Sequence, residues 1–191
     1  RGTDAGNTYA TSIDLTSDYD WTGVNETNTY YGNMAATGYS STSDANNDFF
    51  TIDPPAGYGV EATITWNGTG MGTYDNYAYR LAMGPTSAAG WSYGTSATYG
   101  GAYGYCYYSA SFEISMNTEA GNNNAGSPPY CYFASSSYYA NLPQYFTTPM
   151  DLAGDPIMVI ASCYYCYYYA TNADYQLDIT VFPADAGQSG D

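Results

Sequence analysis

The sequence contains no histidine and no lysine, and its only basic side chains are two arginines, Arg1 and Arg80. Without histidine, the chain has no Ser-His-Asp triad, no Cys-His pair and no histidine-ligated zinc. Paired carboxylates remain as an acid–base arrangement, but no two acids in the sequence are favoured for that role. We therefore expect that the protein is not an enzyme and that it carries no organic cofactor.

Against the two arginines stand 18 acids, which give a formal net charge of −16. Such a chain is repelled by nucleic acids and by anionic membrane surfaces, and it attracts Ca²⁺. No apolar run approaches the ~20 residues that a membrane helix needs. We expect no nucleic-acid partner and no membrane span.

Helical periodicity is also missing, because no window keeps apolar residues at positions i, i+3, i+4 and i+7. The sequence instead alternates with period two, most clearly at residues 48–66 (DFFTIDPPAGYGVEATITW), which we interpret as two strands of a hairpin around Pro54–Gly57. We expect further strands near 9–15, 21–24, 30–39, 75–83, 111–116 and 174–181. The apolar run 156–161 predicts a strand covered on both faces. Together these predict an all-β fold, a two-sheet β-sandwich or jelly roll with long Gly/Ser/Tyr-rich loops.

The two ends of the chain are polar and contain glycine. We interpret residues 1–8 as an arm or linker, 9–183 as one β-sandwich domain and 184–191 as a tail. Because the sequence does not begin with methionine, we expect a mature or excised segment. The ending ADAGQSGD echoes the opening DAGN, so the chain is expected to be one unit of a covalent or assembled array.

Four segments in this order resemble a known family: NNDFFTIDPPAGYGVEATITWNG, YDNYAYRLAMG, GDPIMVIAS and ADYQLDITVF. With the opening DAGNTYATSIDL, they resemble the bacterial and archaeal pre-peptidase C-terminal (PPC) domain over residues 4–15, 44–84 and 154–182. The resemblance implies a secreted β-sandwich appended to enzymes or surface proteins, which assists binding, secretion or assembly and is not catalytic. Residues 85–153 depart from the family pattern as an enlarged, Tyr-rich insertion.

Four cysteines in a chain rich in Tyr, Ser, Thr, Asn and Gly favour an oxidising, extracellular compartment. We expect structural disulfides among Cys106, Cys131, Cys163 and Cys166, for which three pairings exist. Pairing of Cys106 with Cys131 and of Cys163 with Cys166 is favoured, although the second bond requires a turn because residues three apart in a strand are ~10 Å apart. A zinc site and a redox pair are the alternatives.

Tyrosines form dense clusters that could serve as a recognition surface. Their rings stack on sugars and bury a large area in protein contacts, although high β-propensity alone also explains tyrosine in strands. Adjacent tyrosines in a strand point to opposite faces, so we expect a neighbouring subunit or glycan to cover part of this surface. The candidate contact residues are Tyr107, Tyr108, Tyr138, Tyr139, Tyr164, Tyr165, Tyr167 and Tyr168.

Two further kinds of site are suggested by short patterns. Asn25 and Asn67 begin Asn-x-Thr tripeptides, the acceptor pattern for N-linked glycan, which also arises by chance. Acids in turns and at strand starts are candidate Ca²⁺ ligands, with solvated turn residues as the alternative and no EF-hand spacing. These acids are Asp18, Asp20, Asp44, Asp48 and Asp75.

From these features we expect an extracellular, glycosylated structural subunit of a homopolymeric surface filament or layer. Its partners would be copies of itself, joined by terminal-arm or strand contacts and Tyr-rich faces, together with covalent or bound glycans. The alternative is a carbohydrate-binding or accessory PPC-like module of a larger secreted enzyme.

Overall fold

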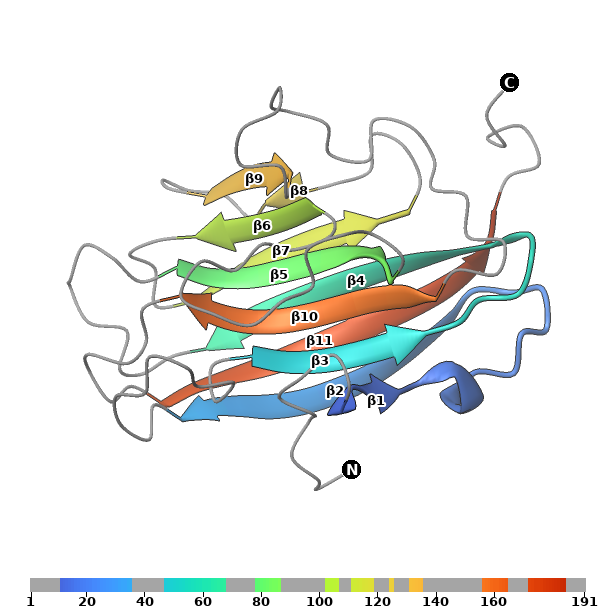
Figure 1. Cartoon of the computed structure of the whole chain (residues 1–191), viewed down its shortest axis with the longest axis horizontal. Coiled ribbons are helices and arrows are strands. Elements are labelled where there is room, and N and C mark those ends of the chain that lie inside the picture. The colour runs from blue at the N-terminus through green and yellow to red at the C-terminus, as the bar shows by residue number, and fades with distance from the viewer. Residues whose placement is uncertain are drawn as a thin grey trace.

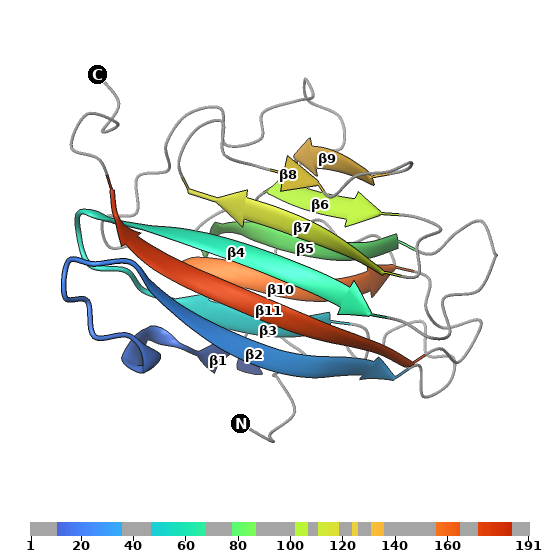
Figure 2. The same cartoon turned by 180° about the vertical axis from the view of Figure 1, so that it is seen from behind.

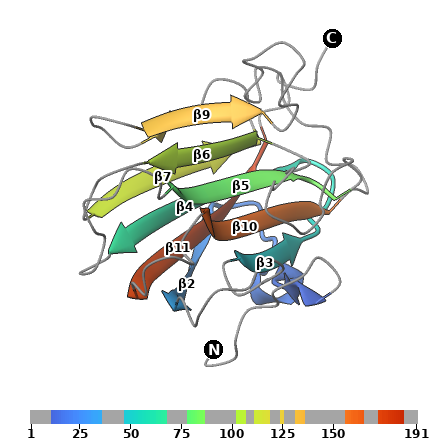
Figure 3. The same ribbon diagram turned by 60° about the vertical axis from the view of Figure 1, so that its left-hand side comes forward.

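The structure, a computed structural model, describes residues 11–35, 47–67, 78–86, 102–106, 111–118, 124–125, 131–135, 156–164 and 172–184. Within these ranges the chain forms two β-sheets packed face to face, as Figures 1 and 3 show. The all-β, two-sheet sandwich expected from the alternating sequence is confirmed. No helix in the described ranges is long and apolar enough to cross a membrane.

Sheet A has six strands, and all but its first pair are antiparallel. Its spatial order is β1 (Ile13–Asp14), β3 (Asn47–Ile52), β10 (Ile157–Tyr164), β5 (Ala78–Pro85), β6 (Ala102–Cys106) and β9 (Cys131–Ser135). The short β1 runs parallel to β3, with Ile13 opposite Phe50.

Sheet B has five antiparallel strands and lies behind sheet A in Figure 1. Its order is β2 (Glu26–Ala35), β11 (Asn172–Pro183), β4 (Tyr58–Asn67), β7 (Ser111–Asn117) and β8 (Asn124–Ala125). Within the stretch 85–153, strands β6 and β9 extend sheet A while β7 and β8 extend sheet B. The range expected as a Tyr-rich insertion therefore adds two strands to each sheet.

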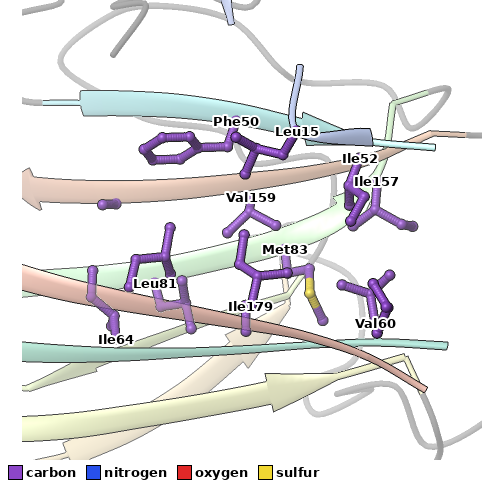
Figure 4. Close-up of a cluster of buried hydrophobic side chains, with 14 of the residues drawn as sticks. Leu15, Phe50, Ile52, Val60, Ile64, Leu81, Met83, Ile157, Val159 and Ile179 are labelled. Carbon is purple, nitrogen blue, oxygen red and sulfur yellow. The ribbon is translucent and has the colours of Figure 1, made fainter. Parts of the chain in front are cut away.

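The core lies between the sheets and is built by period-two alternation, because successive strand residues point to opposite faces. In β4 the side chains of Val60, Ala62, Ile64 and Trp66 are fully buried, and the residues between them are partly exposed. Figure 4 shows side chains from both sheets meeting in this layer. The cluster contains Leu15, Phe50, Ile52, Val60, Ile64, Leu81, Met83, Ile157, Val159 and Ile179 among others.

The expected hairpin at residues 48–66 is wrong as a pairing, although both of its strands exist. Strand β3 lies in sheet A and β4 in sheet B, so the segment 53–57 carries the chain from one layer to the other. Pro54 and Pro55 have no N–H to donate to a ladder, which disfavours continuous pairing at this point. Gly57, at φ 85°, supplies the left-handed turn residue that the sequence predicted.

The expected strands near the N-terminus also need correction. The strand expected at 9–15 is described only at Ile13–Asp14, and it is followed by a 3-10 turn, η2 (Thr16–Asp18). Residues 21–24 form no strand, because Trp21 (φ 55°) and Gly23 (φ 83°) adopt left-handed backbone angles incompatible with an extended chain. The strand expected at 30–39 begins earlier, at Glu26.

The prediction that residues 156–161 form a strand covered on both faces is confirmed. Every residue from Ile157 to Ala161 has no exposed surface. Ile157, Val159 and Ala161 join the core between the sheets, whereas Met158 and Ile160 join a second cluster on the outer side of sheet A. The strands expected near 75–83, 111–116 and 174–181 are present as β5, β7 and β11.

Candidate assembly edge

Strand β2 is the outermost strand of sheet B and pairs only with β11 within the described part of the chain. Figure 2 shows it running along the margin of the sheet. It is ten residues long, ETNTYYGNMA, and its only charged residue is Glu26 at the first position. Proteins usually protect such edges with lysine, proline, bulges or short strands. Strand β2 contains neither lysine nor proline to protect its outer backbone edge, and no strand in the described ranges pairs with that edge.

Polar side chains on the outer face hold β2 to β11 in a fixed register. The hydroxyl groups of Thr27 and Thr180 are 2.7 Å apart, and Thr29 Oγ1 donates to Asp178 Oδ1 at 2.6 Å. Asn33 Nδ2 donates to Asp174 Oδ1 at 2.5 Å. Because these pairs are direct register partners, they make slippage of β2 along β11 unfavourable.

On the inner face, a glycine allows β2 to accept an aromatic ring. Gly32 is the register partner of Tyr175, and a Cβ at this glycine would lie 2.2 Å from the Tyr175 ring. The ring passes over Gly32, and its hydroxyl donates to Oδ2 of the buried Asp48 in sheet A at 2.5 Å. A hydrogen bond between buried groups is strengthened by the low local dielectric, so this contact ties the edge region of sheet B to sheet A.

The segment between β1 and β2 packs against the start of β4 through an aromatic cluster. The Trp21 ring lies 5.6 Å from the Tyr19 ring and 5.3 Å from the Tyr58 ring, and Tyr58 Oη donates to the Trp21 carbonyl at 2.6 Å. Tyr19 is buried, and its hydroxyl donates to the Ile179 carbonyl at 2.9 Å. Burial, helped by the neighbouring Tyr30, raises the pKa of Tyr19 well above its ordinary value.

The largest exposed apolar side chains in the described ranges lie on or next to β2. Tyr31 is 74% exposed and points to the outer face, and Val24 is 62% exposed two residues before the strand. Tyr31 is not among the contact residues expected from the sequence. The signal was present, because Tyr30-Tyr31 is an adjacent pair in a strand, and one member must leave the core.

The structure describes three of the five acids proposed as Ca²⁺ ligands, Asp18, Asp20 and Asp48. Asp18 accepts a hydrogen bond from Tyr30 Oη at 3.1 Å, and the Asp20 amide donates to Glu26 Oε2 at 2.9 Å. Asp48 is buried and accepts from Tyr175. Among the described residues, no group of three or more metal-binding side chains comes together. Asp44 and Asp75 lie outside the described residues.

The remaining predicted site residues are placed only in part. Asn25 is exposed just before β2, where a glycan would have access to solvent, and Asn67 is the last residue of β4. Cys106 and Cys131 are register partners, and Cys163 lies in β10. Tyr164 ends β10. Outside the described residues lie Cys166, Tyr107, Tyr108, Tyr138, Tyr139, Tyr165, Tyr167 and Tyr168.

No known family model matches the sequence. No curated protein matches it significantly either. The resemblance to the PPC domain therefore stays a prediction from the segments that carry it.

Proposed function

We propose that the protein is an extracellular structural subunit that assembles with copies of itself into a surface filament or layer and carries glycan. The observation that supports this most directly is the unprotected edge of β2. An exposed strand edge offers a row of backbone donors and acceptors to an incoming strand. In a polymer, a terminal arm or strand of a neighbouring copy fills that row.

The exposed side chains beside the edge fit the same role. Tyr31 buries a large surface at low cost in side-chain entropy when a neighbour covers it, which is why tyrosine is enriched in protein interfaces. Its neighbours on the outer face, Thr29 and Asn33, already hydrogen-bond to β11. A neighbouring subunit would therefore meet an ordered edge rather than a loose strand, which lowers the entropic cost of association.

Net charge sets a condition on this assembly. Copies with a formal charge of −16 repel each other. At physiological ionic strength, salt screens the repulsion between exposed charges that are farther apart than the Debye length of about 8 Å. Polymerisation is therefore expected to strengthen from low salt to physiological salt. Cations that neutralise surface acids, Ca²⁺ included, should act in the same direction.

Polymerisation is tested with the full chain by sedimentation and negative-stain microscopy over a range of protein and salt concentrations. The edge variant is the double substitution Thr29→Lys and Tyr31→Lys. The control is Thr180→Lys and Gln176→Lys, which adds the same charge to the same face on β11, one strand inside the edge. Both variants reduce overall repulsion equally, so a difference between them reports on the edge alone.

We expect the unmodified chain and the control to form polymers. The edge variant should polymerise only at a protein concentration at least tenfold higher. Contacts between subunits should bury well over about 1,000 Å² in total, as stable interfaces do. A chain that remains monomeric at high concentration and physiological salt would contradict the proposal. So would an edge variant that polymerises as readily as the control.

A second function, binding of a soluble polysaccharide as a PPC-like accessory module, is favoured by the surroundings of Tyr31. Its exposed ring lies opposite Gln176 on a face that also carries Asn33, Asp174 and Asp178. An aromatic ring among amide and carboxylate groups suits sugar stacking and hydrogen bonding. Tyr31→Ala should abolish binding on a glycan array if this function holds. A monomer that binds glycan would favour it over the polymer.

A further inference from the structure

Three of the four cysteines lie in one row that crosses four neighbouring strands of sheet A. Cys163 in β10 is the register partner of Tyr79 in β5, and Tyr79 is the partner of Cys106 in β6. Cys106 is in turn the partner of Cys131 in β9. The row therefore reads Cys163, Tyr79, Cys106, Cys131 across β10, β5, β6 and β9.

The row fixes which cysteines can reach each other. Directly opposite residues in antiparallel strands have Cα atoms about 4.5–5.5 Å apart, which is within the 4.4–6.8 Å span of a disulfide. Cys106 and Cys163 are separated by β5, which places their Cα atoms about 9.5 Å apart. Cys131 and Cys163 are three strands apart, at about 14 Å. Both of these separations exceed the roughly 7 Å limit for a disulfide without backbone movement.

Four cysteines allow three complete pairings. One contains the pair Cys106–Cys163 and another contains Cys131–Cys163, and the register of sheet A excludes both. We propose that the oxidised protein contains a cross-strand disulfide between Cys106 and Cys131, and that Cys163 bonds with Cys166. The sequence analysis already favoured this pairing without excluding the other two, and the register removes both competitors.

Each bond forms by thiol–disulfide exchange with a disulfide oxidant. One thiolate attacks the oxidant to give a mixed disulfide, and the second thiolate displaces the oxidant's remaining sulfur. The two cysteines lose two protons and two electrons in total, and the oxidant is reduced to two thiols. An extracellular compartment keeps such bonds oxidised.

The Cys106–Cys131 bond would close a loop that passes through both layers. Between the two cysteines the chain leaves sheet A, forms β7 and β8 at the far edge of sheet B, and returns to sheet A as β9. The bond therefore fastens the β6–β9 edge of sheet A and limits the freedom of the sheet B strands in between. This inference is independent of self-association, since it concerns a single subunit.

Disulfide mapping tests the proposal on the unmodified chain, secreted under oxidising conditions. Trypsin is unsuitable, because the chain offers only two basic cleavage sites. Pepsin at low pH cleaves near aromatic residues, and low pH also suppresses exchange by keeping thiols protonated. We expect one linked peptide pair containing Cys106 and Cys131, and one species in which Cys163 is joined to Cys166. Any peptide that links Cys163 to Cys106 or Cys131, or four free thiols, would overturn the proposal.

Thermal unfolding of serine variants gives a second, independent measurement. Cys106→Ser, Cys131→Ser and the double variant should lower Tm by the same amount, roughly 5–15 °C, because each removes the same bond. Each single variant should expose one thiol to alkylation after unfolding, and the double variant none. Additive Tm losses for the two single variants would show that the cysteines are not bonded to each other.

Discussion

The outer faces of the two sheets differ in what they present. On the outer face of sheet A, four apolar side chains of β3, β5 and β10 are buried and form a second cluster: Phe49, Ala82, Met158 and Ile160. On sheet B, most of the described outer side chains of β2, β11 and β4 are polar and at least partly exposed, among them Thr27, Thr29, Thr63, Thr65, Asp178 and Thr180. Around this cluster sheet A is therefore covered on both faces, whereas sheet B is covered on one.

The difference shows which surface of the sandwich is available for contacts. An antiparallel sheet with one solvated face alternates apolar and polar residues, whereas a strand covered on both faces is continuously apolar. Strands β4 and β11 show the first pattern and β10 the second. Within the described residues, sheet B presents the solvated face, where Tyr31 lies, and β2 is the longest of the four edge strands.

The largest effect should come from truncating the outer cluster of sheet A. Ile160→Ala removes a fully buried side chain and should lower the free energy of unfolding by about 2–5 kcal/mol. Thr65→Ala on the outer face of sheet B is the matched control and should cost less than about 1 kcal/mol. Urea unfolding of both variants measures the difference. Equal losses would mean that the two outer faces are equally buried in solution.

A second contrast comes from two glycines that each lie under an aromatic ring. A Cβ at Gly32 would lie 2.2 Å from the Tyr175 ring on the buried side of sheet B, and one at Gly59 would lie 2.4 Å from the Phe182 ring. Gly32→Ala must displace a buried ring that holds Asp48, so we expect a loss of about 2–4 kcal/mol. At Gly59 the partly exposed Phe182 ring has room on its solvent side, but the Cβ would also lie 3.1 Å from Oγ1 of the buried Thr118, so Gly59→Ala should cost about 1–2 kcal/mol. A larger loss at Gly59 would contradict the assignment of the inner face.

Much of the fold could be predicted from the sequence because alternation reports directly on burial. Residues 58–66 and 174–181 alternate, and their apolar members form the core. Alternation cannot say which strand pairs with which, so residues 48–66 were interpreted as a hairpin when β3 and β4 belong to different sheets. The two prolines that end the first strand were interpreted as a tight turn, but they carry the chain across the sandwich.

The candidate edge was less predictable, because an edge is a property of sheet order. The sequence of β2, ETNTYYGNMA, does not by itself indicate which strands lie beside it. In the described sheet, β2 has β11 on one side and no strand on the other. Gly32 is similar, since its role depends on the Tyr175 ring from a segment far along the chain. In contrast, Cys106 and Cys131 were favoured as partners from the sequence alone, and they are register partners in sheet A.

Tyr19 allows burial between the two sheets to be tested by the pH dependence of stability. Its pKa is raised in the folded state, so the unfolded chain loses this proton first, near pH 10, and stability should fall as pH rises further. The contribution of this one group is about 1.4 kcal/mol per pH unit above pH 10. Tyr19→Phe should lose about 1–2 kcal/mol at neutral pH, because the Ile179 carbonyl loses a donor, but its stability should then decline less steeply above pH 10.

Urea unfolding of both chains between pH 8 and pH 11.5 measures this slope. The other tyrosines titrate in both proteins, so their effect cancels in the difference between the two curves. Parallel curves above pH 10 would show that Tyr19 ionises equally in the folded and unfolded states. They would also argue against burial of its hydroxyl between the sheets.

The smallest effect should come from the outer face of sheet B, at the pair that joins β2 to β11. Thr27 and Thr180 are register partners with hydroxyl groups 2.7 Å apart, and both are accessible to water. A double-mutant cycle with Thr27→Val and Thr180→Val should give a coupling of about 0.2–1 kcal/mol, because water replaces the lost hydrogen bond. The cycle is best measured below the concentration at which the chain associates. A coupling above about 1.5 kcal/mol would indicate that this pair is buried, and the solvated face assigned to sheet B would then be wrong.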